Sequence, residues 1–327
     1  KSAVYINGKK VKEHLGGYLP FSVSLTDEGV NAGDTCLVAV YADNSDDKSF
    51  PPGKPQYTLD FAYHGGIYRD VWMIAKSKVA ITDPIEANKT AGGGLFVHFD
   101  NISDSRADIF IDTDIKNSDN SSKRITLLTE LCDSSGKVIK SVRSNVRLAS
   151  GESKAVKQKI TISNPNLWSP RNPYLYRINS RVMYGSKPLD GGTTRIGIRL
   201  AEFRGKDGFY LNGKPYGQLV GANRHQDFAY VGNAVPNSQH WRDAKKLRDA
   251  GCEIIRAAHY PQDPSFMDAC DELGMFVIVA TPGWQYWNKD PKFGLLAQEN
   301  NRQMIRRDRN HPSVIAWEPI LNETRFP

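Results

Sequence analysis

Four apolar segments in the last third of the sequence are each followed by polar or aromatic residues. These groups are Asn223-Arg224-His225, His259-Tyr260, Trp284 with Tyr286 and Trp287, and Asn322-Glu323. A carboxyl group that follows an apolar strand is partly desolvated, which raises its pKa and lets it deliver a proton near neutral pH. Glu323 is therefore a candidate general acid. The same pattern also fits a structural glutamate bonded to the next helix, so both interpretations stay open.

Two histidines occupy equivalent positions after neighbouring apolar segments. His225 follows Arg224, and His259 precedes Tyr260. Each histidine could be a metal ligand, an acid–base group, a partner of sugar hydroxyls or a structural residue. No second ligand lies at a fixed local offset from either one, which disfavours a zinc site. Their matching positions at two strand ends support the functional interpretation as much as the structural one.

The segment TPGWQYW carries three aromatic residues within four positions. Trp284, Tyr286 and Trp287 follow a Pro-Gly pair, which is more typical of a loop than of a core strand. An exposed ring offers an apolar face to the C–H face of a sugar. We therefore predict a stacking wall here, with ordinary core packing as the alternative.

A second carboxylate, Glu318, lies five residues before Glu323. An odd offset places two residues of an extended strand on opposite faces. The two glutamates are thus not expected to form a pair unless Pro319 interrupts the pleat. We interpret Glu318 as structural.

Alternating strands and helices are expected to position these groups. Strands are predicted at 218–225, 252–261, 275–283 and 313–321, with helices from Ser238 to Gly251, from Asp263 to Gly274, and over 295–312. Such alternation indicates a parallel sheet, either doubly wound or the first half of an eight-unit barrel. The first strand lacks the G-x-G-x-x-G fingerprint, so the barrel is favoured. In a barrel the reacting groups lie where the strands end.

The first 200 residues show the shorter period of strands. Residues 3–75 contain the Asn7-Gly8 hairpin signal in AVYINGKKV and further strand candidates at 35–43 and 66–75. In residues 78–199, the segment ADIFIDTDI places Ile109, Ile111, Thr113 and Ile115 on one face. Short strands separated by turns predict a β-sandwich for this middle part.

Composition excludes several classes of protein. A chain of 327 residues suggests two or three domains. The net charge is +7, but the basic residues are scattered and no nucleic-acid motif occurs. Cysteines at 36, 132, 252 and 270 lack metal-binding spacing, and no apolar run reaches the length of a membrane span. We expect no nucleic-acid or membrane partner, and the sequence identifies no cellular compartment.

Several long motifs, in order along the chain, resemble family 2 of the glycoside hydrolases, the β-galactosidase and β-glucuronidase group. They are VYINGKKVKEHLGGYLPFS, HGGIYRDVWMIA, NLWSPRNPYLY, NGKPYGQLVGANRHQD, RAAHYPQDPSFMDACDELGMFVI and RDRNHPSVIAWEPILNE. The resemblance implies a sugar-binding jelly-roll domain over 1–77, an immunoglobulin-like β-sandwich over 78–199, and the first half of a TIM-barrel catalytic domain over 200–327. It also implies that the sequence begins inside the jelly roll.

The resemblance also implies roles for individual residues in a retaining hydrolase that uses two glutamates. Glu323 matches the acid/base and Asn322 the residue that holds the sugar 2-hydroxyl, while the nucleophile would follow the seventh strand, beyond Pro327. Asp60 matches a jelly-roll aspartate that binds sugar hydroxyls; a loop-capping role is its alternative. His225 and His259 match sugar-contacting histidines.

Other features refine the expected substrate and cofactors. The segment containing Arg224 and His225 favours the galactosidase branch, and we add Arg224 and Trp284 to the expected substrate-binding residues. Where metal-dependent β-galactosidases carry a Glu and a His after the third strand, this chain has VATPGWQYW, so we predict no metal there and no cofactor.

The sequence therefore predicts an exo-acting β-galactosidase that hydrolyses terminal β-linked sugars of oligo- or polysaccharides. The alternatives are a β-glucuronidase or β-mannosidase of the same family, or a non-catalytic carbohydrate-binding protein with a degenerate barrel. A carbohydrate is the expected partner, a homo-oligomer is compatible with the family, and residues 1–327 alone are expected to be inactive.

Overall fold

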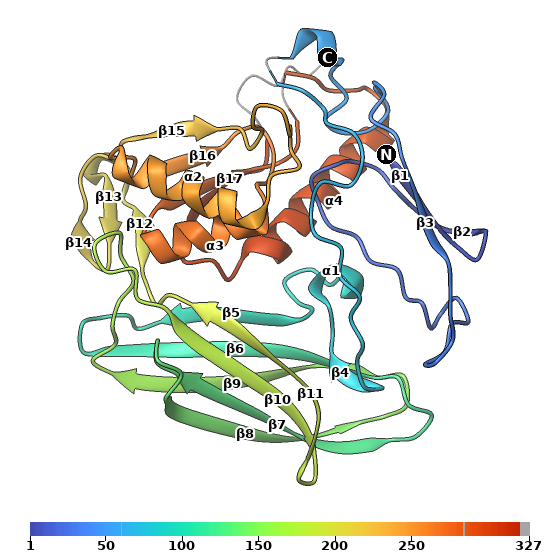
Figure 1. Cartoon of the computed structure of the whole chain (residues 1–327). Helices are drawn as coiled ribbons and strands as arrows, with labels where there is room; N and C mark the ends of the chain where they lie inside the picture. Colours follow the sequence, from blue (N-terminus) through green and yellow to red (C-terminus); the bar gives the residue numbers. More distant parts are fainter. Residues whose placement is uncertain (60, 284, 321–327) are drawn as a thin grey trace.

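The computed structural model describes residues 1–59, 61–283 and 285–320 and has three parts (Figure 1). A small antiparallel sheet near the N-terminus lies at one side, a two-sheet sandwich forms the base, and a parallel sheet with its helices lies above the sandwich. Within these ranges, no helix combines the length and the apolar character needed to cross a membrane.

The N-terminal sheet contains the predicted hairpin. β1 (Ser2–Ile6) pairs with β2 (Lys9–His14) on one edge and with β3 (Val38–Ala42) on the other. Asn7 and Gly8, between β1 and β2, have φ of 50° and 85°. An Asn-Gly pair adopts this left-handed backbone with little strain, so the turn prediction is confirmed.

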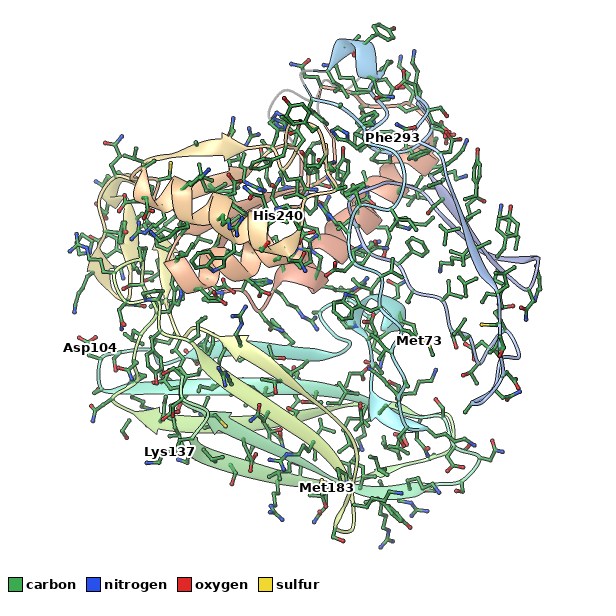
Figure 2. The ribbon with its side chains drawn as sticks, in the orientation of Figure 1. Met73, Asp104, Lys137, Met183, His240 and Phe293 are labelled. Carbon is green, nitrogen blue, oxygen red and sulfur yellow. The ribbon has the colours of Figure 1, made fainter. Side chains whose placement is uncertain are left out.

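Residues 66–75 form no strand, although the sequence pattern predicted one. A short 3-10 helix, η1 (Gln56–Thr58), and irregular backbone occupy the described part of the connection between β3 and the sandwich. Trp72 and Met73 are 77% and 86% exposed, and Figure 2 labels Met73. A strand needs a neighbour for its backbone hydrogen bonds, and no strand in the described ranges pairs with this segment.

The middle part is a sandwich of two antiparallel four-stranded sheets. One sheet contains β4 (Val79–Ile81), β5 (Leu95–Asp100), β6 (Arg106–Asn117) and β9 (Ser153–Ser163), and the other contains β7 (Lys123–Cys132), β8 (Val138–Leu148), β10 (Tyr176–Tyr184) and β11 (Lys187–Ile196). Helix α1 (Pro84–Ala87) follows β4. Ile109, Ile111 and Ile115 of β6 are fully buried, as their alternation predicted. They pack with Leu127 and Leu131 of β7 in the space between the sheets.

The last part contains the parallel sheet. It begins with a small sheet of β12 (Ala201–Phe203), β13 (Phe209–Leu211) and β14 (Lys214–Pro215), with the 3-10 helix η2 (Gly205–Asp207) between the first two strands. Strands and helices then alternate in the order β15 (Gly221–Arg224), α2 (Asn237–Asp249), β16 (Ile254–Ala257), α3 (Pro264–Leu273), β17 (Phe276–Ala280), α4 (Pro291–Asp308) and β18 (Val314–Glu318). The four strands are parallel and adjacent in chain order, β15-β16-β17-β18. A doubly wound sheet reverses its strand order, so this order favours the barrel architecture.

Helix α3 has both ends at the predicted residues. The Asp263 carboxylate accepts the N–H of Ser265 at 2.9 Å, and Pro264 occupies the first helical position. Gly274 ends the helix with φ of 70°. Its missing side chain is also required by space, since a Cβ there would lie 2.7 Å from the Pro170 carbonyl oxygen.

The starts of the other two helices differ from the prediction. Helix α2 has Pro236 at its N-cap, so Ser238 lies inside the first turn. Helix α4 begins at Pro291, four residues before the predicted start, because the Asp290 carboxylate caps the N–H of Lys292. A proline at the first helical position and an aspartate before it are strong start signals, and they outweighed the apolar spacing used in the prediction.

Trp168, in the motif NLWSPRNPYLY, joins the sandwich to the parallel sheet. Its side chain is fully buried, its indole N–H donates to the Asp271 carbonyl oxygen at 2.9 Å, and its ring meets Phe276 of β17 edge to face. On the same side, the Arg199 guanidinium donates to the carbonyl oxygens of Pro312 and Val314. These contacts fix the parallel sheet, and hence its strand ends, on the sandwich.

Candidate active site

Two predicted site residues meet at the carboxyl ends of β15 and β16. The strands run in register, with Arg224 opposite Ala257, so His225 and His259 emerge side by side. Their ring centroids are 5.5 Å apart and the planes are inclined by 71°. His259 is buried at 7% exposure, whereas His225 is half-buried. The prediction that both histidines share one end of the sheet is correct.

The N-terminal region, meaning the residues before β4, supplies an aromatic cover for these two rings. The Phe61 ring stacks on His225 with centroids 5.2 Å apart, and it lies 5.9 Å from His259 and 5.7 Å from Tyr260. Tyr260 stacks in turn on Tyr18, with centroids 4.3 Å apart. Sequence analysis missed Phe61, although its position directly after the predicted Asp60 was a usable signal. The candidate site is therefore shared between the first and last parts of the chain.

Four predicted site residues lie outside the described ranges: Asp60, Trp284, Asn322 and Glu323. The first is the chain neighbour of Phe61, and the last two follow β18 by a few positions. Their roles remain predictions.

Arg224 is directed towards protein groups. Its guanidinium donates to the Asp243 carboxylate and to the side-chain oxygen of Gln262, and it lies 3.2 Å from Nδ1 of His240. It also lies 3.9 Å above the Phe266 ring, and its side chain is 4% exposed. These contacts favour a role in holding the start of the 225–236 loop over direct contact with a ligand.

His240 of α2, labelled in Figure 2, lies beside Arg224 and supports the same cluster as a neutral acceptor. Burial lowers the pKa of His240 to about 4, with the nearby Asp263 carboxylate opposing this effect and the Arg224 guanidinium adding to it. A neutral imidazole can accept a hydrogen bond from an arginine, whereas an imidazolium cannot. The ring therefore helps to hold Arg224 without adding charge.

Glu318 is structural, as predicted. Its two carboxylate oxygens accept from Nε and Nη2 of Arg256 at 2.8 and 2.6 Å. Arg256 lies on β16 and Glu318 on β18, so the pair reaches past β17. Side chains from alternate strands form the interior layers of a strand–helix barrel, and this ion pair has that arrangement.

The aromatic loop after β17 packs on the N-terminal region. The rings of Tyr286 and Trp287 meet Phe293 of α4 with centroids 5.9 and 5.4 Å away (Phe293 in Figure 2). Tyr286 also touches Gly53, where a Cβ would lie 2.7 Å from the ring, and Asn288 donates to the Lys48 carbonyl oxygen at 2.7 Å. These two rings therefore dock the loop onto α4 and the N-terminal region, and the stacking wall that includes Trp284 stays a prediction.

One group in the described ranges has the geometry of metal ligands, but it lies at the other end of β18. Asp268, Asp271 and His311 hold their ligand atoms within 4.8 Å of one another. Nδ1 of His311 is 2.6 Å from the Asp271 carboxylate, which also accepts the N–H of Ser313 at 3.0 Å, and Asp268 pairs with Arg195. These protein partners account for the cluster as a structural contact. The Asp271–His311 pair joins α3 to the start of β18.

Comparisons with known proteins identify two matching family models. The model described as "Glycosyl hydrolases family 2, TIM barrel domain" matches residues 203–326, and "Glycosyl hydrolases family 2" matches residues 94–199. A β-galactosidase from Thermoanaerobacter pseudethanolicus is 37% identical over 322 residues, covering 98% of this chain and 41% of that protein. A β-glucuronidase from Bacteroides fragilis is 31% identical, covering 98% of this chain and 46% of that protein.

Solved structures agree with these sequence matches. The structure of Bacteroides uniformis β-glucuronidase 2 covalently bound to cyclophellitol-6-carboxylate aziridine superposes with a TM-score of 0.87 at 32% identity. It covers 97% of this chain and 37% of that one. A putative β-galactosidase from Bacteroides fragilis gives a TM-score of 0.87 at 29% identity, covering 97% of this chain and 46% of that one. The chain thus spans less than half the length of each of these four proteins.

Proposed function

Because its sequence and fold match these models and relatives, the chain belongs to glycoside hydrolase family 2, and on that premise we propose that the protein is a retaining, exo-acting β-glycosidase. We propose β-galactoside ends of oligo- or polysaccharides as the substrate, in line with the β-galactosidase relative at 37% identity. We also propose that residues 1–77, 78–199 and 200–327 correspond to a jelly roll, an immunoglobulin-like sandwich and the first half of the barrel.

One observation supports this function above the others: the meeting of His225, His259 and Phe61 at the carboxyl ends of β15 and β16. Imidazole nitrogens can donate to or accept from sugar hydroxyls, and an aromatic ring can pack on the C–H face of a sugar. In strand–helix barrels this end of the sheet carries the chemistry. These three side chains are therefore suited to contact a sugar ring bound at this end of the sheet.

The proposed reaction is double displacement. Glu323 protonates the glycosidic oxygen while a second glutamate, which we place outside residues 1–327, forms the glycosyl-enzyme. Glu323 then activates water, and the two carboxyl groups are expected about 5–5.5 Å apart, the separation typical of retaining enzymes. Asn322 would hold the sugar 2-hydroxyl, and Asp60 and Trp284 would line the same pocket. We propose that no metal binds in the loop after β17.

A β-glucuronidase is the second candidate, because relatives 31–32% identical are named β-glucuronidase or putative β-glucuronidase, and one solved structure is covalently bound to cyclophellitol-6-carboxylate aziridine. The discriminating experiment supplies the protein at its natural full length with matched aryl β-galactoside and aryl β-glucuronide. Faster hydrolysis of the galactoside supports our proposal, and faster hydrolysis of the glucuronide replaces it with the second candidate.

The product anomer tests the stereochemical part of the proposal. Proton NMR of early time points should show the β-sugar first, since double displacement retains configuration. An initial α-product contradicts the retaining mechanism. Sugar binding without hydrolysis of either substrate would instead support a carbohydrate-binding protein with a degenerate barrel.

A further inference from the structure

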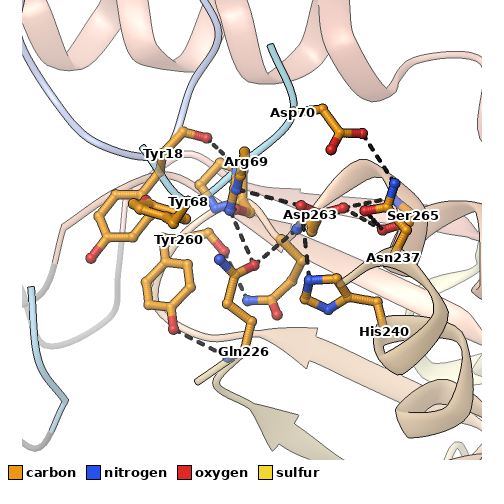
Figure 3. Close-up of polar contacts among 12 residues, drawn as sticks. Tyr18, Tyr68, Arg69, Asp70, Gln226, Asn237, His240, Tyr260, Asp263 and Ser265 are labelled. Carbon is orange, nitrogen blue, oxygen red and sulfur yellow. Dashed lines mark hydrogen bonds and ion pairs between the residues drawn. The ribbon is translucent and has the colours of Figure 1, made fainter. Parts of the chain in front are cut away.

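Arg69 of the N-terminal region lies where three separate segments meet (Figure 3). Its guanidinium donates to the carbonyl oxygen of Tyr18 at 2.6 Å, to Oε1 of Gln226 at 3.1 Å and to the carbonyl oxygen of Pro261 at 2.7 Å. The side chain is 18% exposed, and its Nε atom is buried. One cationic group thus touches the N-terminal region and the loops that follow β15 and β16.

The contact with Gln226 acts on the loop that carries His225. Gln226 is fully buried and directly follows this histidine in the chain. The side-chain Oε1 of Gln226 accepts from Arg69 and also from the backbone N–H of Asp263 at 2.9 Å. The backbone N–H of Gln226 donates to the Tyr260 hydroxyl at 3.2 Å. The backbone beside His225 is therefore tied to the β16 loop through one amide side chain.

The contact with Pro261 acts on the loop that carries His259. Pro261 lies two residues after this histidine. Tyr260, between them, stacks on the ring of Tyr18, and the carbonyl oxygen of Tyr18 is another Arg69 acceptor. The guanidinium and the stacked tyrosines thus both hold the loop that carries His259.

The surroundings of Arg69 make this arrangement sensitive to change. The Asp263 carboxylate is 4.0 Å from Nε, and burial lowers the pKa of Arg69. Next to Arg69, the Asp70 carboxylate accepts from Asn237 at the start of α2 at 3.0 Å. Loss of a buried donor leaves its acceptors without partners, and an unpaired buried acceptor is destabilising. Lysine has a point charge and no planar fork, so it cannot reproduce the three directions.

We infer that Arg69 is a positioning residue for the proposed reaction: it fixes His225 and His259 in one geometry, so that docking of the N-terminal region completes the sugar site. This inference rests on the proposed function. Arg69 acts on the two histidines through Gln226 and Pro261. A displacement of about 1 Å at a reacting centre can lower a rate about 100-fold, which makes such positioning consequential.

The test compares Arg69→Lys with Arg306→Lys in the protein at its natural full length. Arg306 is a matched control, because it is also a buried arginine joining two parts of the fold, donating to the Lys89 carbonyl oxygen and to Asn88 far along the chain from the histidines. Three experiments are made on each variant: steady-state kinetics, giving kcat and KM on the aryl β-galactoside and β-glucuronide, urea unfolding, giving the midpoint, and NMR of the histidine rings.

We expect Arg69→Lys to lower kcat/KM by about 10- to 100-fold and to shift the ring signals of His225 and His259. Arg306→Lys should lower the urea midpoint but leave both ring signals and kcat/KM within about threefold of wild type. Equal kinetic effects of the two variants, with unchanged histidine signals in Arg69→Lys, overturn the inference.

Two further measurements apply if Arg69→Lys does not fold or if wild type is inactive. If Arg69→Lys does not fold, Gln226→Met removes the same link from the barrel side, and unchanged His225 signals in that variant overturn the inference. If wild type hydrolyses neither glycoside, the proposed function fails by itself. The histidine signals then still decide whether Arg69 sets the geometry of the two loops.

Discussion

The sandwich and the histidine-bearing end of the parallel sheet are stabilised in different ways. Between the two sheets of the sandwich, fully buried aliphatic side chains such as Ile109, Ile111 and Leu131 pack without polar partners. Around the histidines, the buried groups include Arg224, Gln226, His240, Gln262 and Asp263. Apolar burial depends on area and tolerates small shifts, whereas a polar network depends on direction. Apolar area therefore dominates between the two sheets, whereas directional polar contacts dominate around the histidines.

The largest expected effect belongs to the sandwich. Ile111→Ala should reduce the free energy of unfolding by about 2–5 kcal/mol, because it removes buried methyl groups and leaves a cavity. Activity per folded molecule should not change. Urea unfolding and active-site titration measure the two quantities, with the 47% exposed Ile139→Ala as the control. Loss of activity in the folded fraction of Ile111→Ala would break the distinction between the two regions.

The next effect concerns the Asp271–His311 pair, which joins α3 to the start of β18. Burial lowers the pKa of His311, but the charge and hydrogen bond of Asp271 outweigh it and raise the pKa to about 9, above the ordinary value of 6.5. The pair therefore stabilises the fold fully below pH 6.5 and loses this contribution as the pH rises through about 9. The full contribution is on the order of 3 kcal/mol.

Urea unfolding between pH 6 and pH 10 checks this dependence. Wild type should lose more stability over that range than His311→Gln, in which position 311 cannot titrate. If the free energy of unfolding falls equally with pH in the two proteins, the Asp271–His311 pair contributes no pH-dependent stability.

The smallest expected effect concerns the aromatic ring that covers the two histidines. Phe61→Ala removes the ring that covers His225 and His259, and we expect kcat/KM to fall about tenfold, since such aromatic contacts are worth roughly 0.5–1.5 kcal/mol. Phe203→Ala is the control, because Phe203 also packs on another ring but lies on β12 and is 63% exposed. Steady-state kinetics should separate the two variants; equal kcat/KM would mean that the aromatic cover has no role in catalysis.

Local signals in the sequence predicted much of the fold. The Asn7-Gly8 turn, the caps of α3 and the alternating face of β6 each depend on neighbours within a few positions, and the structure has all three. The strand predicted at 66–75 failed because pairing is a long-range property that side-chain pattern does not report. The start of α2 failed because Pro236 set the boundary before the apolar spacing began.

The candidate site was predictable only in part. His225 and His259 could be placed together because parallel strands end at one edge. Phe61 and Arg69 could not, because 157 residues separate Arg69 from Gln226 and no periodicity links them. Contacts between distant segments therefore supplied the part of the site that pattern reasoning missed.

The role of Glu323 as the acid/base of a retaining glycosidase can be measured with Glu323→Ala on an activated aryl β-galactoside, with and without azide. An activated leaving group needs little protonation, so the variant should be slow in deglycosylation, and azide should restore turnover while forming β-galactosyl azide. Glu13→Ala, on exposed β2, should match wild type and ignore azide. Wild-type rates in Glu323→Ala, or no azide adduct from a slowed variant, would contradict the assignment.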